Sequence, residues 1–467
     1  MIDLKDLREN PDKYRTGALL KKMDAGVVDR LLDADAAIKP LQLERENLTA
    51  ETNRIGKEIG PLQGKLKKAQ GDEKAQLEAQ VKELLARPAV IKARLEELTA
   101  KIAALEPKRD EMLLLVPQPP DADVPRGNGP EDNVEIRRWN SPWFDTSKSF
   151  EANKGFKPRS HVELLQKHGL VDFERGVKLA GSRSYVLTGA GMQLHSAVLR
   201  YAVDYMVNEN GFTAMSVPVL VREEAMIGTA FFPHGKEQAY EVGEKARGGS
   251  YDLYLTGTGE VGLMGYHMGE MIDPQKLPLK YTTVSTCFRR EAGAAGKDTK
   301  GLYRIHQFDK VEQVVICKAD VAESRAWHQK MMGFVETLLQ RLEIPYRLLQ
   351  CCTADLGPKN VDMIDIESWM PSRGDETTLP DGSVTWSGAY SETHSASRLY
   401  DYQCRRLNIR YKDPETKKNV VCHALNNTVA ASPRILIPIV ELYQNADGSI
   451  TVPKVLRGYM GGMERIG

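Results

Sequence analysis

Apolar residues recur every seven positions through the first quarter of the chain. Within 77–112 one column of the repeat is apolar, and a second column four residues further on is mostly apolar; 31–62 carries the same pattern. A sustained seven-residue repeat with two apolar positions is typical of a coiled coil. It predicts two helices of about 35–40 residues, roughly 55 Å long at 1.5 Å per residue. Their apolar columns are Leu41, Leu48, Ile55 and Leu62 with Leu31, Ile38 and Ile59, then Leu77, Leu84, Ile91, Leu98, Leu105 and Met112 with Val81, Leu95 and Ile102.

The two predicted helices are separated by Gly60, Pro61, Gly64 and Gly71, which favour a turn and an antiparallel hairpin. Pro88 falls within the second helix, where a proline removes one hydrogen bond and kinks the backbone, so we expect a bent but continuous helix. Cations gather near the predicted tip, and there they could be a solvated surface or could contact phosphates. The pattern alone leaves a dimerisation rod and a nucleic-acid-binding arm equally open. The cations are Arg54, Lys57, Lys65, Lys67, Lys68 and Lys74.

A Pro- and Gly-rich stretch follows the predicted arm, and its prolines can neither continue a helix nor enter a central strand. We therefore expect a helical arm over 1–116, a linker over 117–133 and a second domain over 134–467. The second domain alternates short segments and favours an α+β fold with an antiparallel sheet. Strands are predicted at 212–221, 280–288, 303–317, 361–366 and 418–423, and helices at 194–208 and 433–444.

The composition limits the classes of protein to which the chain can belong. The chain has 467 residues, 41% of them hydrophobic, with 64 Lys+Arg against 64 Asp+Glu. This suits two or three folded domains, and zero net charge does not exclude a nucleic-acid partner because steering depends on where charge lies. No apolar run approaches the ~20 residues of a membrane helix and no signal peptide is evident, so we expect a cytoplasmic protein without a membrane partner. Six scattered cysteines without a CxxC pair predict free thiols and no zinc.

The densest chemistry lies in 287–312. Arg289 and Glu291 directly follow the predicted strand 280–288, and Arg304 and Phe308 fall on the predicted return strand. Residues two apart share a strand face, so Arg289 and Glu291 are expected to project together, as are Arg304 and Phe308. A guanidinium matches phosphate oxygens and a carboxylate can accept from a base, which favours a nucleoside triphosphate site. An exposed ladder of ion pairs is the alternative. The GxGxxG at 257–262 is a weak dinucleotide signal, because the next strand carries no acidic residue for a ribose.

The segment 281–313 closely resembles motif 2 of the class II aminoacyl-tRNA synthetases, in the form seen in seryl-tRNA synthetases. Residues 424–444 resemble motif 3, and Pro218 resembles the motif 1 proline. Thr258-Gly259-Glu260 is similar to the family's serine loop, 392–406 to the stretch between motifs 2 and 3, and the N-terminal hairpin to its tRNA-binding arm. This ordered set of motifs is highly specific, and it implies an antiparallel class II catalytic domain behind a coiled-coil arm.

The resemblance assigns roles residue by residue. Arg289 and Arg434 would be the catalytic residues, Arg289 at the α-phosphate and serine carboxylate and Arg434 beside the adenine and γ-phosphate. Glu291 would contact the adenine, Phe308 would stack on it, and Arg304 would neutralise the triphosphate. The other residues implied around ATP are Arg290, Ile305, Glu392, Thr393, His394 and Ser395. Glu392 and Ser395 would hold Mg²⁺, and the residues implied for serine are Thr258, Gly259, Glu260, Arg289, Glu312, Asn426 and Thr428.

Some positions depart from the family's usual pattern. Gly257 and Gly259 flank Thr258 where Pro-Thr-Ala is common, Asn427 and Val429 replace motif 3 glycines, and Arg290 replaces a small residue. None of these departures removes a charged group from the set of residues that the resemblance implies. Two histidines, His306 and His423, are expected to be structural. Three further residues are expected on the motif 2 loop, either near the tRNA acceptor end or in solvent: Lys297, Asp298 and Lys300.

The resemblance thus implies a homodimeric serine–tRNA ligase that activates L-serine with ATP and Mg²⁺ and charges tRNA(Ser), with tRNA(Sec) left open. An enzyme that passes activated serine to a carrier protein or a biosynthetic acceptor is one alternative, and the full arm argues against it. A non-catalytic tRNA-binding paralogue is another, opposed by the complete set of charged residues. A purely structural coiled-coil protein leaves those residues unexplained.

Overall fold

The computed structural model describes residues 1–294, 300–380, 382 and 384–467. It divides into two units. One comprises residues 3–16 and 24–116, and the other comprises residues 1–2, 17–23 and 117–467. The change at Val116 coincides with the end of the predicted helical arm.

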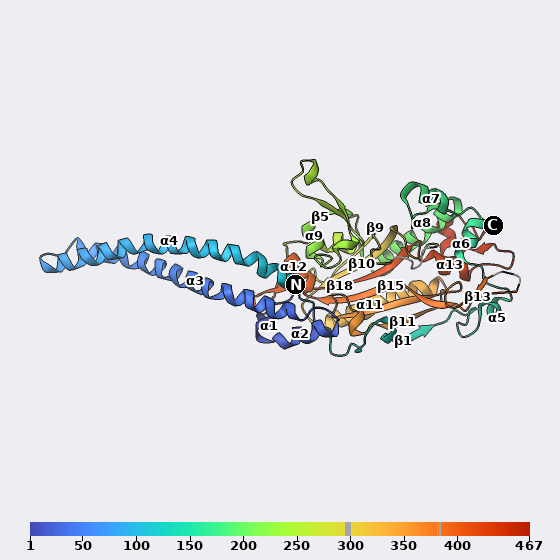
Figure 1. The fold of residues 1–467 in the computed structure, drawn as a ribbon, viewed down its shortest axis with the longest axis horizontal. Coiled ribbons are helices and arrows are strands. Elements are labelled where there is room, and N and C mark those ends of the chain that lie inside the picture. The colour runs from blue at the N-terminus through green and yellow to red at the C-terminus, as the bar shows by residue number, and fades with distance from the viewer. Residues whose placement is uncertain (295–299, 381, 383) are drawn as a thin grey trace. The chain divides into compact units, whose positions relative to one another are not determined.

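The arm consists of two long helices, α3 (Gly26–Leu66) and α4 (Asp72–Leu115), which run side by side in Figure 1. The short helices α1 (Leu4–Glu9) and α2 (Pro11–Leu20) precede them. The side chain of Arg94 donates two hydrogen bonds across the hairpin to Glu44, at 2.7 and 2.9 Å. The predicted apolar columns supply the buried seam, which confirms the antiparallel hairpin. Its buried members include Leu31, Ile38, Ile55, Val81, Ile91, Leu98 and Ile102.

The turn of the hairpin lies further along the chain than the sequence predicts. α3 continues through Gly60, Pro61 and Gly64 to Leu66, and the turn occupies 67–71, where Gly71 has φ +58°. Gly and Pro weaken a helix by about 1 and 3 kcal/mol respectively, but packing along an apolar seam can outweigh such local preferences. α4 is continuous through Pro88, as expected.

The second unit is built on an eight-stranded sheet with the order β1-β11-β12-β15-β18-β10-β9-β4. Neighbouring strands are antiparallel except β9 and β4, which are parallel. This confirms the predicted antiparallel sheet. The strands are β1 (Val134–Trp139), β4 (Thr213–Ala214), β9 (Leu279–Phe288), β10 (Gln307–Cys317), β11 (Tyr346–Gln350), β12 (Asp362–Met370), β15 (Ala389–Tyr400) and β18 (His423–Ser432).

One face of this sheet is covered by α11 (Val321–Arg341). The backbone oxygen of Met331 in α11 accepts hydrogen bonds from Gln313 of β10 and Asn427 of β18, both at 3.1 Å. Alternate residues of a strand point to opposite faces. Glu312 and the residues two and four before it therefore point away from α11, toward the face on which the candidate site lies.

Shorter elements surround the sheet. The remaining helices are α5 (Phe150–Lys154), α6 (His161–Lys167), α7 (Phe173–Ala180), α8 (Gly189–Asp204), α9 (Glu223–Gly228), α10 (Glu260–Gly265), α12 (Tyr402–Leu407) and α13 (Leu436–Leu442). The remaining strands are β2 (Val171–Asp172), β3 (Val186–Leu187), β5 (Leu220–Arg222), β6 (Tyr240–Val242), β7 (Leu253–Leu255), β8 (Met271–Ile272), β13 (Glu376–Thr378), β14 (Val384–Trp386), β16 (Arg410–Lys412), β17 (Asn419–Val421), β19 (Ile450–Thr451) and β20 (Arg465–Ile466).

Two predicted strands are partly wrong. The predicted strand 303–317 begins only at Gln307, whereas the strand predicted at 280–288 is confirmed as β9, which ends at Phe288. One more backbone hydrogen bond, from Arg289 N to His306 O at 2.9 Å, follows, and then Glu291 adopts φ +52° and ends the extended backbone. The predicted strand 212–221 splits into β4 and β5, because Pro218 lies between them and has no N–H for a ladder.

The other predicted elements shift at their ends. The helix predicted at 194–208 begins earlier, as α8, and passes at Tyr205 into a π turn. The helix predicted at 433–444 is the shorter α13, and the strand predicted at 361–366 extends to the end of β12. The strand predicted at 418–423 comprises β17 and the first residue of β18.

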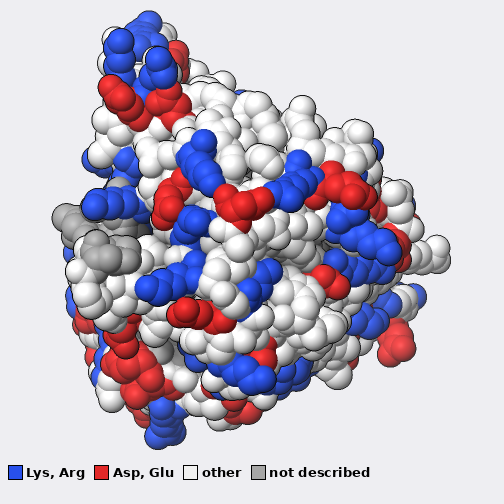
Figure 2. Space-filling view, turned by 90° about the vertical axis from the view of Figure 1, so that its right-hand side faces the viewer, with Lys and Arg blue, Asp and Glu red and all other residues white. Residues whose placement is uncertain are grey.

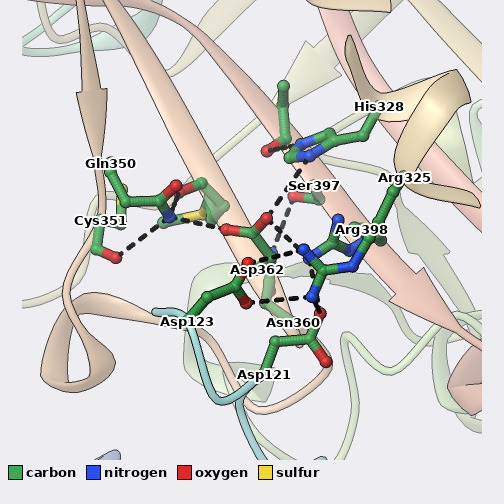
Figure 3. Close-up of polar contacts among 12 residues, drawn as sticks. Asp121, Asp123, Arg325, His328, Gln350, Cys351, Asn360, Asp362, Ser397 and Arg398 are labelled. Carbon is green, nitrogen blue, oxygen red and sulfur yellow. Dashed lines mark hydrogen bonds and ion pairs between the residues drawn. The ribbon is translucent and has the colours of Figure 1, made fainter. Parts of the chain in front are cut away.

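The stretch 117–133, which the sequence suggests is a linker, belongs to the second unit. Figure 3 shows how two of its three aspartates, Asp121 and Asp123, are held. Asp121 accepts from Arg325 of α11 at 2.8 Å and from Arg398 of β15 at 2.5 Å, and Arg325 also contacts Asp123 at 2.6 Å. Arg398 in turn pairs with Asp362 of β12 at 2.9 Å. Because these ion pairs reach a buried arginine, the segment is an anchored part of this unit.

The surface drawn in Figure 2 intersperses Lys and Arg with Asp and Glu, in keeping with the balanced charge of the chain. The six cysteines are free and buried, as predicted. Across the described residues, no helix combines the length and the apolar character that a bilayer span requires.

Candidate active site

Five charged side chains from separate segments converge on one place. Arg289 and Glu291 follow β9, Arg304 precedes β10, Glu392 lies on β15, and Arg434 follows β18. All five line both a small cavity of about 50 Å³ and a larger one of about 700 Å³. The shared lining makes the two cavities parts of one site.

Arg289 is oriented by two contacts. Its Nε donates to the backbone oxygen of Gly257 at 3.3 Å, and its guanidinium carbon lies 5.3 Å from the ring centroid of Phe308. A guanidinium over an aromatic ring is favourable by about 0.5–2 kcal/mol, depending on its exposure. The ring and the carbonyl therefore fix a positive charge at the boundary between the two cavities.

Glu291 and Arg304 form an ion pair at 2.6 Å across the opening of the hairpin. The Glu291 side chain is 13% exposed and that of Arg304 is 30% exposed. The expected strand-face arrangement is wrong for both residues, since neither lies in a strand, but the loop still brings them to the same cavity. A nucleotide bound in the predicted manner would separate this pair, because its adenine and its phosphates would take different partners.

Arg434 is held by the segment that precedes β10 and by β15. Its Nε donates to the backbone oxygen of Tyr303 at 3.2 Å, and its Nη1 donates to the backbone oxygen of Glu392 at 3.2 Å. Its guanidinium carbon also lies 4.5 Å from the Tyr303 ring centroid, and the same ring lies 4.1 Å from the guanidinium carbon of Arg373. Sequence reasoning missed Tyr303 and Arg373; for Tyr303, its place next to Arg304 was the available signal.

Three of the residues implied for serine, Thr258, Asn426 and Thr428, meet around a fourth, Glu312, whose side chain is 1% exposed. Thr258 Oγ1 donates to Glu312 Oε2 at 3.0 Å, and Asn426 Nδ2 approaches Glu312 Oε1 at 3.5 Å. Thr428 lies opposite Glu312 in the β10–β18 register and lines the small cavity. The ammonium group of Lys310, two residues before Glu312 on the same strand face, pairs with the Glu312 carboxylate and also lines that cavity. Sequence reasoning missed Lys310, although the two-residue spacing was visible.

Glycine at position 259 has a steric cause. A Cβ atom there would lie 2.5 Å from Thr283 Cγ2 and 2.9 Å from Ser285 Oγ, both on β9. Separations this short would force the neighbouring side chains to move. The side chains of β9 therefore account for a glycine at this position, where the resemblance led us to expect alanine.

Glu392 and Ser395 lie three residues apart, and a regular strand would point them to opposite faces. The pairing of β15 with β12 shifts between Ile366–His394 and Glu367–Glu392, which leaves Thr393 as an extra residue. This bulge returns Glu392 and Ser395 to one face. The Glu392 side chain is 47% exposed, so its carboxylate is accessible to a metal ion.

His394 points away from the cavities. It is 1% exposed, its Nδ1 lies 2.9 Å from Thr393 Oγ1, and burial lowers its pKa to about 3. The imidazole is therefore neutral at ordinary pH. The sequence placed His394 beside ATP, whereas the structure places its side chain on the buried side of β15.

Another group with metal-ligating atoms is formed by Cys351, Asp355 and Asp365, whose ligand atoms lie within 4.8 Å of one another. Asp365 is opposite Ser395 in the strand register. Burial raises the pKa of the Cys351 thiol and, together with Glu392, that of Asp365. Raised pKa values favour the protonated groups, which are poor metal ligands.

Most of the predicted nucleotide residues thus line the cavities, including Ile305, Phe308 and Thr393. Arg290 is exposed and lines neither cavity, and Ser395 also lies outside both linings. The predicted structural histidines are hydrogen-bonded: His306 Nδ1 lies 2.9 Å from Arg289 O, and His423 Nδ1 lies 2.8 Å from Ser324 Oγ. Lys300 is exposed. Two members of the predicted motif 2 loop, Lys297 and Asp298, lie outside the described residues.

Comparisons with known proteins agree with this geometry. Residues 1–120 match the seryl-tRNA synthetase N-terminal domain, and residues 241–443 match the tRNA synthetase class II core domain (G, H, P, S and T). A serine–tRNA ligase of Deinococcus radiodurans is 39% identical over 100% of this chain and 99% of its own length. One of Streptomyces coelicolor is 39% identical over 99% of this chain and 98% of its own length.

Solved structures give the same result. The seryl-tRNA synthetase of Pyrococcus horikoshii complexed with ATP superposes with a TM-score of 0.79 at 36% identity, covering 100% of this chain and 99% of that one. The cytoplasmic serine–tRNA ligase of Naegleria fowleri in complex with AMP has a TM-score of 0.77 at 28% identity. The match covers 98% of this chain and 95% of that one. With identities this high over both whole chains, the protein belongs to the seryl-tRNA synthetase family of class II aminoacyl-tRNA synthetases.

Proposed function

We propose that this protein is a serine–tRNA ligase, which activates L-serine with ATP and transfers it to tRNA(Ser). The observation that carries the proposal is the convergence of Arg289, Glu291, Arg304, Glu392 and Arg434 on one cavity beside the Glu312 cluster. These side chains supply the cations and hydrogen-bonding groups that a triphosphate and a small polar amino acid require. Names of relatives that cover the whole chain support the same reaction.

The first step joins serine to the nucleotide. A carboxylate oxygen of serine attacks the α-phosphorus of ATP, and the bond to the β-phosphate oxygen breaks to release pyrophosphate. Arg289 would stabilise the negative charge that develops at the α-phosphate, and Arg434 and Arg304 would hold the departing phosphates. Positioning and charge neutralisation are the main needs of such an in-line displacement.

Glu392 and Ser395 offer the hard oxygen ligands that Mg²⁺ prefers, and the bulge at Thr393 places both on one face. They would hold the ion, which would supply charge neutralisation to the triphosphate. The second step is attack by a hydroxyl of the terminal ribose of the tRNA on the seryl carbonyl, with AMP leaving. Arg289, which in the proposal also contacts the serine carboxylate, is placed to orient that carbonyl.

Selection of serine would depend on Glu312 and its neighbours. Thr258, Asn426 and Thr428 surround the Glu312 carboxylate with polar groups in a largely buried site. A site built to hydrogen-bond a hydroxyl rejects an analogue that lacks it, because its buried polar groups would be left unpaired. We therefore expect alanine and glycine to be poor substrates.

The arm would bind the tRNA, since exposed cations cluster at its end: Arg54, Lys57, Lys65, Lys67, Lys68 and Lys74. We propose a homodimer in the cytoplasm, the compartment of the proposed substrates. A dimer is supported by exposed apolar side chains, Leu179 at 79% and Met192 at 47%, that line a common cavity. Sedimentation velocity at micromolar concentration would give the mass of two chains, and a single-chain mass would contradict the dimer.

The experiment that tests the proposed reaction is charging of total tRNA with radiolabelled serine in the presence of ATP and Mg²⁺. We expect serine to become acid-precipitable and to be released by mild base, which hydrolyses the ester. An enzyme that passes serine to a carrier would activate serine but leave the tRNA uncharged, and that result would reject the ligase. Addition of purified tRNA(Sec) would then decide whether that tRNA is also a substrate.

A further inference from the structure

The carboxylate of Glu260 is hydrogen-bonded by two other side chains of the protein. Glu260 is 2% exposed, and its Oε1 accepts hydrogen bonds from Lys359 Nζ at 2.5 Å and from Gln403 Nε2 at 2.7 Å. The Lys359 side chain is 13% exposed and its ammonium lies 4.4 Å from the ring centroid of Phe231. The family resemblance assigns Glu260 to serine, yet in this protein two donors already hold one of its carboxylate oxygens.

Glu260 is also linked to the serine-binding cluster through its backbone. Its N–H donates to Thr258 Oγ1 at 3.3 Å, and Thr258 Oγ1 donates to Glu312 Oε2 at 3.0 Å. Any displacement of Glu260 would therefore move the hydroxyl that orients Glu312. The Glu260 side chain acts as the anchor of this short chain of hydrogen bonds.

A second lysine, Lys21, holds the backbone of the loop that carries Lys359. Lys21 is 3% exposed, and its ammonium donates to the backbone oxygens of Gly357 at 2.8 Å and Asn360 at 2.5 Å. These two carbonyls flank Lys359 in the sequence. These two hydrogen bonds hold the backbone on either side of Lys359, from which its side chain reaches Glu260.

Lys359 also lies at the edge of the site. It lines the larger cavity together with Gly257, whose backbone oxygen accepts from Arg289. The Lys359–Glu260 ion pair is therefore next to the larger cavity, which Lys359 itself lines. We propose that Lys359, supported by Lys21, is a positioning residue for serine binding: it anchors Glu260, and through Thr258 it fixes the orientation of Glu312. This inference rests on the proposed serine activation.

The experiment measures serine-dependent ATP–pyrophosphate exchange in the full chain. Lys359→Met leaves Glu260 without its cationic partner, and we expect the KM for serine to rise by about tenfold or more with little change in the KM for ATP. Lys148→Met is the matched control, because its ion pair with Asp145 is long, at 3.6 Å, and exposed. It should leave both KM values unchanged. A Lys359→Met effect no larger than that control would overturn the proposal.

The double variant Glu260→Gln with Lys359→Met distinguishes anchoring from direct binding of serine, and it guards against misfolding by removing both charges together. Gln403 can still donate to a glutamine at 260, so we expect most of the serine affinity to return. If Glu260 itself received the serine ammonium, the double variant would remain as defective as Glu260→Gln alone, which would refute the positioning role. Absence of serine-dependent exchange in the unaltered protein would instead reject the proposed function.

Discussion

Arg289→Ala is the substitution whose effect the site geometry predicts most sharply. The guanidinium lies where the two cavities join, 5.3 Å from the ring centroid of Phe308, and hydrogen-bonds to the backbone of Gly257. In the proposed reaction it would stabilise the charge that develops on the α-phosphate. Loss of one such preorganised group costs about 10²–10³ in kcat, or roughly 3–4 kcal/mol.

The fold should survive this substitution. Arg289 is partly exposed, and with the described residues its side chain makes one hydrogen bond, to a carbonyl, so we expect the free energy of unfolding to fall by about 1 kcal/mol. Arg290→Ala is the matched control, because Arg290 is the next residue, is exposed and lines neither cavity.

The assay is serine-dependent ATP–pyrophosphate exchange at saturating substrates, with urea unfolding measured in parallel. Arg289→Ala should lose exchange while remaining folded, and Arg290→Ala should stay within about threefold of the unaltered protein. Near-normal exchange by Arg289→Ala, or equal losses in the two variants, would refute the assignment of Arg289 to the phosphate.

Four further predictions concern the arm, the core and the metal. Replacing 30–110 by a short linker should leave exchange intact but abolish tRNA charging; unaffected charging would show that the arm is only scaffolding. In the arm, Leu98→Ala should cost about 2–5 kcal/mol by urea unfolding, because Leu98 is fully buried, while Leu85→Ala, at a 53% exposed position, should cost under about 0.5. The pKa of His394 is about 3 in the folded state and near 6.5 when unfolded, so the unfolded state binds the proton first. Unfolding free energy should therefore fall as pH drops from about 6.5 toward 3, by up to about 1.4 kcal/mol per unit, and His394→Gln should flatten this slope. Chelation of Mg²⁺ should stop exchange, and Glu392→Gln should raise the Mg²⁺ concentration needed to restore it; an unchanged requirement would contradict the metal role.

The helical arm was predictable from the sequence. The seven-residue repeat identified residues that form the seam between α3 and α4, because a coiled coil is specified by local spacing. The position of the turn was not predictable in the same way. Gly60 and Pro61 favour a break, yet the helix continues past them to Leu66, since packing along the seam can outweigh local propensity.

The site shows a similar division. Motif order predicted the convergence of Arg289, Glu291 and Arg434, but the strand-face argument given for Glu291 was wrong, because β9 ends before it and its backbone turns left-handed. The partners of some buried charged residues could not be predicted from the sequence. Lys359 and Glu260 are 99 residues apart, and their contact follows from tertiary packing that local spacing does not record. The bulge at Thr393, which brings Glu392 and Ser395 to one face, likewise depends on the register with β12.

The central claim is that the converged charges form one site for ATP and serine. Amino-acid-dependent ATP–pyrophosphate exchange, run separately with serine, threonine, alanine and cysteine, tests it most directly. The account predicts rapid exchange with serine and little with alanine, which lacks the hydroxyl. Folded protein that gives no exchange with serine, or exchanges equally with alanine, would contradict it.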